Sequence, residues 1–342
     1  MITDYSKSLK DLTKEESIRV DNEKTLLVRQ HEANLRLANA PLREHCVLCA
    51  TQLTGEEFLH RKVPFISCKI CGHIQTKAQP PIGFPDEIEK KDTFTKIYPK
   101  LEKKEFEDRK KRIYLPKLNW ILSALERSGY DRSELLRMSW MELGSGEGAF
   151  LSSLQDQGVT NFIGFEREKA LVDRSKSFVS KEKVKLSIES IGETVRKTPV
   201  QIICAFFVFE HDENLPYLIN ALRDCQPGTI LCFSVPMFGL SCLLENIATD
   251  RYARSLDAAI HVQTFTDQSI DFLFSVTNFE QIARWQFGQD ALELSRLLRP
   301  LEKKTSHFDH ITAKLSDCID DIQATVDKHN LCDQIHLIAK KR

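Results

Sequence analysis

From residue 138 onward, short apolar runs alternate with amphipathic stretches. The apolar runs predict strands, and the stretches between them, with apolar residues at helical spacing, predict helices. The run 200–207 is apolar at nearly every position, which is typical of a central parallel strand covered on both faces. This alternation predicts an α/β fold with a doubly wound sheet and a ligand at the carboxyl ends of its strands. The predicted strands are 138–143, 161–165, 184–188, 200–207, 229–235, 279–287 and 334–339, and the predicted helices are 149–157, 169–180, 215–222 (with Asn214 as N-cap) and 265–276.

The chain before residue 138 lacks this alternation. Residues 1–43 are polar, with leucines spaced for one or two amphipathic helices or a partly ordered arm. The proline-rich stretch 80–85 cannot be helical, whereas 91–130 has a helical pattern. A further helical pattern fills the region from about 291 to 330. We therefore divide the chain into an N-terminal helical arm (1–43), a cysteine-containing module (44–77), a connector with helices (78–136) and an α/β domain (137–342) with a helical insertion at about 291–330.

Four of the ten cysteines form two C-x2-C pairs, Cys46 with Cys49 and Cys68 with Cys71. Two such turns can surround one ion tetrahedrally and leave no open position, as in structural zinc sites. We therefore predict a structural Zn²⁺ on these four thiolates, which would stabilise a segment too short to bury a core of its own. His45 and His73 flank the cysteines and are expected beside the site or exposed. The other six cysteines are expected to be small buried hydrophobes or bystanders.

Glycines gather directly after the first predicted strand, in the segment Glu142-Leu-Gly-Ser-Gly-Glu-Gly148. Between a strand and a helix, glycines allow a tight turn and a close approach of the backbone to a ligand. Glu166 ends the second predicted strand, where a carboxylate can accept both ribose hydroxyls of an adenosine. Taken alone, the glycines also fit a dinucleotide site or a flexible turn, and Glu166 fits an exposed acid near a helix start. The third glycine comes one position too early for the G-x-G-x-x-G of a nicotinamide enzyme.

Several ordered segments together resemble class I S-adenosylmethionine-dependent methyltransferases. Residues 142–148 resemble their first motif, 164–166 the acidic end of their second strand, and 205–211 their apolar fourth strand that ends in Glu-His. Gln226-Pro-Gly228 resembles the turn before their fifth strand, and 335–341 resembles their last strand. The resemblance covers about 138–342. It implies a Rossmann-like domain with a mostly parallel, seven-stranded sheet, preceded here by a small zinc-ribbon-like module and helices.

The resemblance also implies roles for individual residues. Glu210 and His211 would be catalytic, with the His211 imidazole taking a proton from the acceptor; alternatively, the pair only orients its loop. His261 and Asp290 could bind substrate, and Tyr114 and Arg112 could close over the cofactor. The residues expected at the S-adenosylmethionine site are Glu142, Gly144, Ser145, Gly146, Gly148, Glu166, Ser190, Ile191, Ala205 and Phe206.

A second resemblance concerns the acceptor. A zinc module ahead of such a domain is similar to the sugar C-methyltransferases, in which the module helps to enclose the substrate. The segments 261–266 and 285–290 are similar to stretches of methyltransferases from polysaccharide gene clusters. The chain departs from the sugar enzymes because it does not include their long additional C-terminal domain, and because Val208 stands where a tyrosine is expected. Both O-methylation and C-methylation therefore remain open.

The balance of charged residues indicates which kinds of binding partner the protein is expected to have. Acidic and basic residues nearly cancel, with a formal net charge of -1, whereas an enzyme of nucleic acids normally carries a basic excess. The basic run 103–112 is interleaved with acids and fits a solvated helix face. The sequence has neither a secretory signal nor an apolar run of about 18 residues. We expect a cytoplasmic protein without a membrane span.

We therefore expect a methyltransferase that acts on a small molecule related to sugars, and not on nucleic acid. Two alternatives stay open. In one, the acceptor is a protein or an RNA, recognised by the zinc module. In the other, the chain is a non-catalytic, methyltransferase-like scaffold, against which the intact glycine segment and Glu166 argue. The leucines and isoleucines of 291–330 could pair two subunits into a homo-oligomer or cover the active site.

Overall fold

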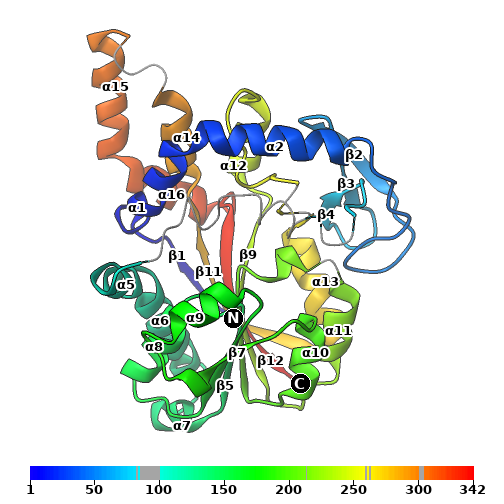
Figure 1. Ribbon diagram of the computed structural model, residues 1–342, viewed down its shortest axis with the longest axis vertical. Coiled ribbons are helices and arrows are strands. Elements are labelled where there is room, and N and C mark those ends of the chain that lie inside the picture. Colours follow the sequence, from blue (N-terminus) through cyan, green and yellow to red (C-terminus); the bar gives the residue numbers. More distant parts are fainter. Residues whose placement is uncertain (82–83, 85–100, 213, 259, 262, 300–303) are drawn as a thin grey trace.

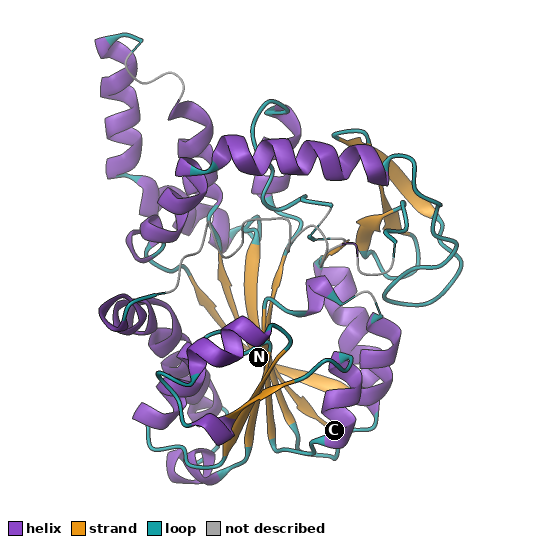
Figure 2. Ribbon diagram, in the orientation of Figure 1, coloured by secondary structure: helices purple, strands orange, loops and turns teal. Residues whose placement is uncertain are grey.

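Eight strands form one mostly parallel sheet at the centre of the molecule (Figures 1 and 2). The computed structural model describes residues 1–81, 84, 101–212, 214–258, 260–261, 263–299 and 304–342. Strand β12 is antiparallel to both of its neighbours, and the other pairs are parallel. In sheet order the strands are β7 (Val184–Leu186), β6 (Phe162–Glu166), β5 (Trp140–Leu143), β8 (Ile202–Phe206), β9 (Ile230–Pro236), β12 (Gln334–Lys341), β11 (Phe279–Phe287) and β1 (Ile2–Tyr5).

Neighbouring residues of the central strands serve two different cores. Side chains alternate between the two faces of a strand, and each face of this sheet is covered. Trp140, Ile202 and Ile230 belong to one buried cluster, and the residues that follow them, at 141, 203 and 231, belong to the other. The predicted Rossmann-like α/β fold with a mostly parallel sheet is confirmed, and apolar residues run through these strands because both faces are buried.

Helices cover both faces of the sheet. On one face lie α6 (Leu115–Arg127), α7 (Arg132–Arg137), α8 (Ala149–Asp156) and α9 (Lys169–Ser175), with α5 (Lys103–Arg109) and a π-helical turn (Lys110–Tyr114) leading into α6. On the other face lie α10 (Ile191–Lys197), α11 (Leu215–Arg223) and α13 (Asp267–Thr277). The structure contains the predicted strands and helices of residues 138–342, but the helix predicted for 169–180 ends at Ser175. Asn214 is the N-cap of α11, as predicted, although its side chain makes no capping hydrogen bond. Part of the helix predicted for 91–130, residues 91–100, lies outside the described residues.

The N-terminal arm contributes a strand as well as helices. A 3-10 turn (Leu9–Asp11), α1 (Thr13–Asp21) and α2 (Glu23–Leu37) agree with the helices predicted there. Strand β1 pairs in parallel with β11, so the prediction of seven strands is wrong. The Asp4 carboxylate accepts hydrogen bonds from Trp120 Nε1 at 2.9 Å and Arg127 Nη2 at 2.5 Å. This strand of four residues is held by partners remote in sequence, and its own pattern does not predict it.

The cysteine module (44–77) forms a second, smaller sheet beside the carboxyl edge of the large one. Its strands are β2 (Gly55–His60), β3 (Val63–Cys68) and β4 (Ile74–Thr76). The fourth strand, β10 (Gln263–Thr264), comes from the α/β domain and pairs antiparallel with β4. The module is therefore completed by a segment far away in the sequence.

The remaining helices gather near the carboxyl ends of the parallel strands. Helix α12 (Leu240–Ile247) follows β9, and α14 (Asp290–Leu298), α15 (Ser306–Asp317) and α16 (Ile319–Lys328) follow β11. Figure 1 shows α2 running from the neighbourhood of α14 to the cysteine module. Helix α15 projects from the body, and none of its residues is buried. Among the described residues, the structure has no helix with the length and apolar character needed to cross a membrane.

Candidate active site

A tight glycine turn joins β5 to α8 at the carboxyl edge of the sheet. Gly144, Gly146 and Gly148 have φ values of 66°, 54° and 84°, in the left-handed region that L side chains rarely adopt. A Cβ built on Gly146 would meet no atom within 4 Å, so this part of the backbone faces open space. The turn thus leaves room for a ligand against the main chain, as the sequence predicts.

Glu166 ends β6 beside this turn. It is buried, and its carboxylate accepts hydrogen bonds from the backbone N–H of Gly146 at 2.8 Å and of Glu168 at 2.9 Å. The strand end and the glycine turn, which are separated in the sequence, therefore meet at one point. A carboxylate at this position can exchange its bond to Gly146 for a ribose hydroxyl.

Two buried polar side chains next to the turn each have an oxygen atom without a hydrogen-bond partner. These are Glu142, at the end of β5, and Ser145, within the turn, whose Oε2 and Oγ atoms are both unpaired. Burial raises the pKa of Glu142 well above its usual value, although the positive charge of Lys117 opposes the shift. Unpaired buried polar atoms are costly unless a ligand satisfies them. Together with the open space at Gly146, they fit the polar groups of S-adenosylmethionine.

Lys117 lies beside two of the predicted site residues, Glu142 and Phe206, and it is not among the residues predicted from the sequence. It lies on α6, is buried, and its Nζ is 4.1 Å from the centroid of the Phe206 ring. Burial lowers its pKa to about 7, and Glu142 partly offsets that shift. In the sequence, Lys117 could have been noticed because it stands four residues before Ile121 and therefore lies on the apolar face of the helix.

The loop after β8 carries the predicted catalytic pair. Phe207 adopts a left-handed φ of 57°, which is uncommon for an aromatic residue and costs energy. A short 3-10 turn, Phe209–His211, follows. A Cβ built on Gly144 would lie 2.7 Å from Cγ2 of Val208, so this loop packs directly against the glycine turn. The predicted catalytic residues and the predicted cofactor turn are thus adjacent.

Glu210, His211 and His261 form a cluster. One potential ligand atom of each lies within 4.8 Å of those of the other two, and the two imidazole centroids are 5.1 Å apart. Nδ1 of His211 is 3.2 Å from the carbonyl oxygen of Ile260, and Nδ1 of His261 is 3.1 Å from that of Arg254. Because a carbonyl oxygen only accepts hydrogen bonds, each Nδ1 carries the proton and each Nε2 has a free lone pair.

The electrostatics of this cluster favour neutral groups. Burial raises the pKa of Glu210 to about 8, and it lowers the pKa of His261 to about 3 and that of His211 below its usual value. Positive charges lower the pKa of both imidazoles further. The charge of Arg167 acts on His211, and the charge of Arg254 acts on His261. The same charges disfavour a bound cation. The arrangement suits a neutral imidazole that accepts a proton next to an uncharged carboxylic acid.

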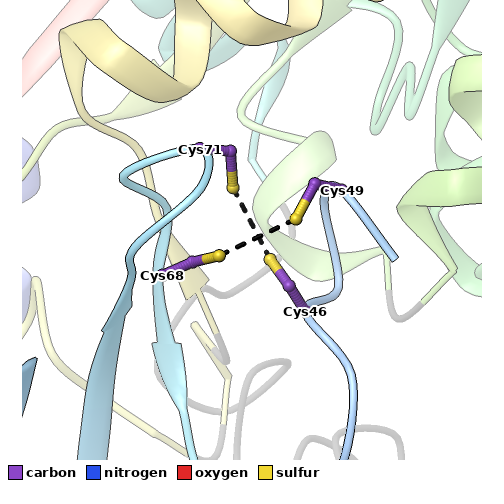
Figure 3. Close-up of side chains that lie close together, drawn as sticks. All are labelled: Cys46, Cys49, Cys68 and Cys71. Atoms are coloured by element: carbon purple, nitrogen blue, oxygen red, sulfur yellow. Dashed lines mark hydrogen bonds between the residues drawn. The ribbon is translucent and has the colours of Figure 1, made fainter. Parts of the chain in front are cut away.

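The four paired cysteines lie close together in the cysteine module (Figure 3). Sγ of Cys46 is 3.6 Å from that of Cys71, and Sγ of Cys49 is 3.7 Å from that of Cys68. A tetrahedron with Zn–S bonds of about 2.3 Å has edges of about 3.8 Å. The four sulfur atoms are therefore spaced as the ligands of one tetrahedral ion would be.

Three other predicted site residues lie at helix ends or in a buried hydrogen-bond network. Ser190 caps α10 by accepting a hydrogen bond from the backbone N–H of Glu193 at 3.2 Å, and Ile191 begins that helix. Asp290 is buried and bonded to Ser241, Gln323 and the backbone of Asp333, so it holds α14 in place and is not available to a substrate.

Two residues were expected to close over the cofactor. Arg112 donates to the backbone carbonyl of Asp11 and pairs with Asp108 at 3.0 Å, so it anchors the N-terminal arm. The half-buried Tyr114 ring packs near Lys117, whose Nζ is 5.3 Å from its centroid. Tyr114 therefore lies beside the same buried lysine that contacts Phe206.

Comparisons with known proteins show the family to which the chain belongs. A family model described as a methyltransferase domain matches residues 108–283, more than half of the chain. Solved structures with a similar arrangement include magnesium protoporphyrin IX methyltransferase from Synechocystis with bound SAH (10% identity, 69% of this chain and 88% of that chain, TM-score 0.43). Others are a SAM-dependent methyltransferase from Archaeoglobus fulgidus (17%, 65% and 94%, TM-score 0.39) and a cyclopropane synthase from Mycobacterium tuberculosis (16%, 60% and 78%, TM-score 0.39). A search of the curated proteins finds no match.

The fold and the glycine turn define a class I methyltransferase, and the chain belongs to the methyltransferase domain family. It is an enzyme that uses S-adenosylmethionine as its methyl donor. Because the TM-scores of the solved structures lie below 0.5, the family match carries this assignment, and the substrates of those proteins say nothing about the acceptor here.

Proposed function

We propose that this enzyme methylates a small acceptor, a sugar, nucleotide-sugar or glycan precursor, at an oxygen or an acidic carbon. The observation that carries the proposal is the His211 imidazole, whose Nδ1 donates to a backbone carbonyl and whose Nε2 is left as an acceptor. It lies in the loop that packs against the glycine turn at Gly144. Half-buried polar groups around it, His261 and Asp212, can match the hydroxyls of a sugar-like molecule.

When bound, S-adenosylmethionine would supply an electrophilic methyl group and leave as S-adenosylhomocysteine. Nε2 of His211 would take the proton that the acceptor atom loses as it is methylated. Glu142, Ser145 and the glycine turn would hold the methionine end, and Glu166 would hold the ribose. Glu210, uncharged in its buried position, would keep a negative charge away from the imidazole and so leave it easier to deprotonate between turnovers.

We also propose that Cys46, Cys49, Cys68 and Cys71 hold a structural Zn²⁺. The sulfur spacing and the burial of three of the four side chains support a closed site. Three of the cysteines belong to the same buried cluster as Phe209 and Phe233. The ion would therefore stabilise one wall of the active site.

The position of the module also bears on the alternative acceptors. Strand β4 of the module pairs with β10 of the α/β domain, whereas β2 is an exposed edge strand. The formal net charge of -1 gives no basic excess for an RNA. The charge therefore disfavours RNA as the acceptor, and the acceptor screen separates a protein from a small molecule.

An acceptor screen tests this function. Purified protein with methyl-labelled S-adenosylmethionine is offered nucleotide sugars, glycan precursors, transfer RNA and protein extracts. We expect label on a sugar-related acceptor, and turnover in His211→Gln reduced by about a hundredfold or more with unchanged S-adenosylmethionine affinity. The exposed His329→Gln serves as the control. Label on RNA or protein alone, or unchanged turnover in His211→Gln, would overturn the proposal.

A further inference from the structure

Gln263 lies where three segments of the chain meet. It is fully buried, and its backbone pairs with Gln75 in the cysteine module through the β10–β4 contact. It also belongs to the segment that follows β9 in the α/β domain. One side chain is therefore in a position to link the module to the sheet.

The Gln263 amide is fully engaged. Its Nε2 donates to the carbonyl oxygens of Phe209 and Asp212, both at 2.9 Å. These two carbonyls flank Glu210 and His211 in the sequence. Its Oε1 is 2.9 Å from Nε2 of His73. Because both carbonyls only accept, the orientation of the amide is fixed, and His73 must donate from Nε2.

His73 belongs to the second cysteine turn. It follows Cys71 by two residues, and its carbonyl oxygen accepts from the backbone N–H of Cys68 at 2.9 Å. Its side chain is fully buried and packs edge-on against Phe265 with centroids 4.9 Å apart. An unbroken series of contacts thus runs from the cysteine turn through His73 and Gln263 to the loop 209–212.

This loop needs outside support. It contains only one short 3-10 turn, and it begins just after Phe207, which has a left-handed φ. Without Gln263, the carbonyls of Phe209 and Asp212 would lose a donor in a buried environment. A displacement of the loop by a fraction of an ångström would move the His211 imidazole, and reaction rates depend steeply on such geometry.

We propose that Gln263 is a positioning residue that couples the cysteine module to the catalytic loop, so that metal in the module sets the orientation of His211. This inference rests on the proposed function for the catalytic role of His211. It assigns the module a part in the reaction beyond stabilising its own fold. Within the cysteine module, the imidazole of His73 is the group that contacts the Gln263 amide.

The test compares Gln263→Leu, which has a similar size and no hydrogen-bonding groups, with the wild type. The probe is the set of NMR signals of the His211 imidazole, assigned with His211→Gln and recorded as a function of pH without acceptor. We expect the His211 signals and their titration to change in the variant, with zinc content unchanged. With an acceptor in hand, kcat falls about tenfold or more, and the S-adenosylmethionine dissociation constant stays within about twofold. The control is Gln226→Leu, an exposed amide in the turn before β9, away from the cysteine module.

A second comparison removes the metal. Chelation should shift the His211 signals of the wild type clearly more than those of Gln263→Leu, because the variant keeps only the packing of Phe209 in the cluster that contains the cysteines. Should Gln263→Leu fail to fold, His73→Phe keeps the aromatic contact with Phe265 and removes only the donor.

The outcomes separate this inference from the proposed function. Identical His211 signals in the wild type and the variants overturn the proposed coupling through Gln263, whatever the acceptor is. Changed signals together with no turnover of any sugar-related acceptor support the coupling and overturn the proposed function.

Discussion

Glu210 is a carboxylic acid whose surroundings hold it uncharged near neutral pH. It is buried, and its Oε2 has no partner, so burial raises its pKa from 4.5 to about 8. A negative charge there would raise the pKa of the neighbouring His211 and favour the imidazolium, which cannot accept a proton. The two residues thus act as a pair in which the acid is kept neutral so that the base stays neutral.

This pairing gives stability a definite pH dependence. The folded pKa of Glu210 is raised, so the folded state binds more protons than the unfolded state between about pH 4.5 and 8. The free energy of unfolding should therefore fall as pH rises through that window. In Glu210→Gln this contribution is absent, so the Tm of the variant relative to that of the wild type should rise by several degrees between about pH 4.5 and 8.

Thermal melts of both proteins across this range check the prediction, with the exposed Glu280→Gln as the control. Parallel Tm curves for wild type and Glu210→Gln would mean that Glu210 is charged in the folded protein.

At the scale of elements, the site is built where strands end. The turn after β5, the end of β6 and the loop after β8 all meet at one edge of the sheet. Each has a local sequence pattern: an apolar run is followed by glycines after β5, by an acid at the end of β6 and by Glu-His after β8. Local patterns of this kind predict both the strands and the residues at their ends, which is why the sequence places Gly146, Glu166 and His211 at strand ends that the structure brings together.

Elements held by remote partners could not be predicted in this way. Strand β1 has only four residues, and β10 has two, and each is a strand only because another segment pairs with it. Lys117 and Gln263 have no motif of their own. Their roles arise from what lies around them, Phe206 and Glu142 in one case and the loop 209–212 in the other.

The cysteine module provides a prediction at this scale. Replacing Cys46 and Cys49 together by serine should remove one equivalent of zinc per chain and lower the Tm, since the two turns would lose their common ion. Metal analysis and thermal melts measure both effects. The exposed Cys318→Ser should change neither. Equal zinc content in the double variant and the wild type would refute the zinc assignment.

At the scale of the whole molecule, parts from distant regions of the sequence cover the carboxyl edge of the sheet. Helix α2 is bound to the segment after α12, because Gln30 Nε2 donates to the carbonyl of Ala253 at 2.9 Å. In the cysteine module, Arg61 Nη2 donates to the carbonyl of Ala248 at 3.0 Å. The N-terminal arm and the module are therefore fixed to the α/β domain on the side of the glycine turn, where we propose that the cofactor binds.

The most direct test of the central claim is titration calorimetry of the purified protein with S-adenosylmethionine and, separately, with NAD. We expect micromolar binding of S-adenosylmethionine, weakened about tenfold or more in Glu166→Ala by loss of the ribose contact, and no binding of NAD. The carboxylate variant Asp173→Ala, on the surface of α9, should bind like the wild type. Binding of NAD, or equal S-adenosylmethionine affinity in Glu166→Ala and the wild type, would contradict the account of the site given above.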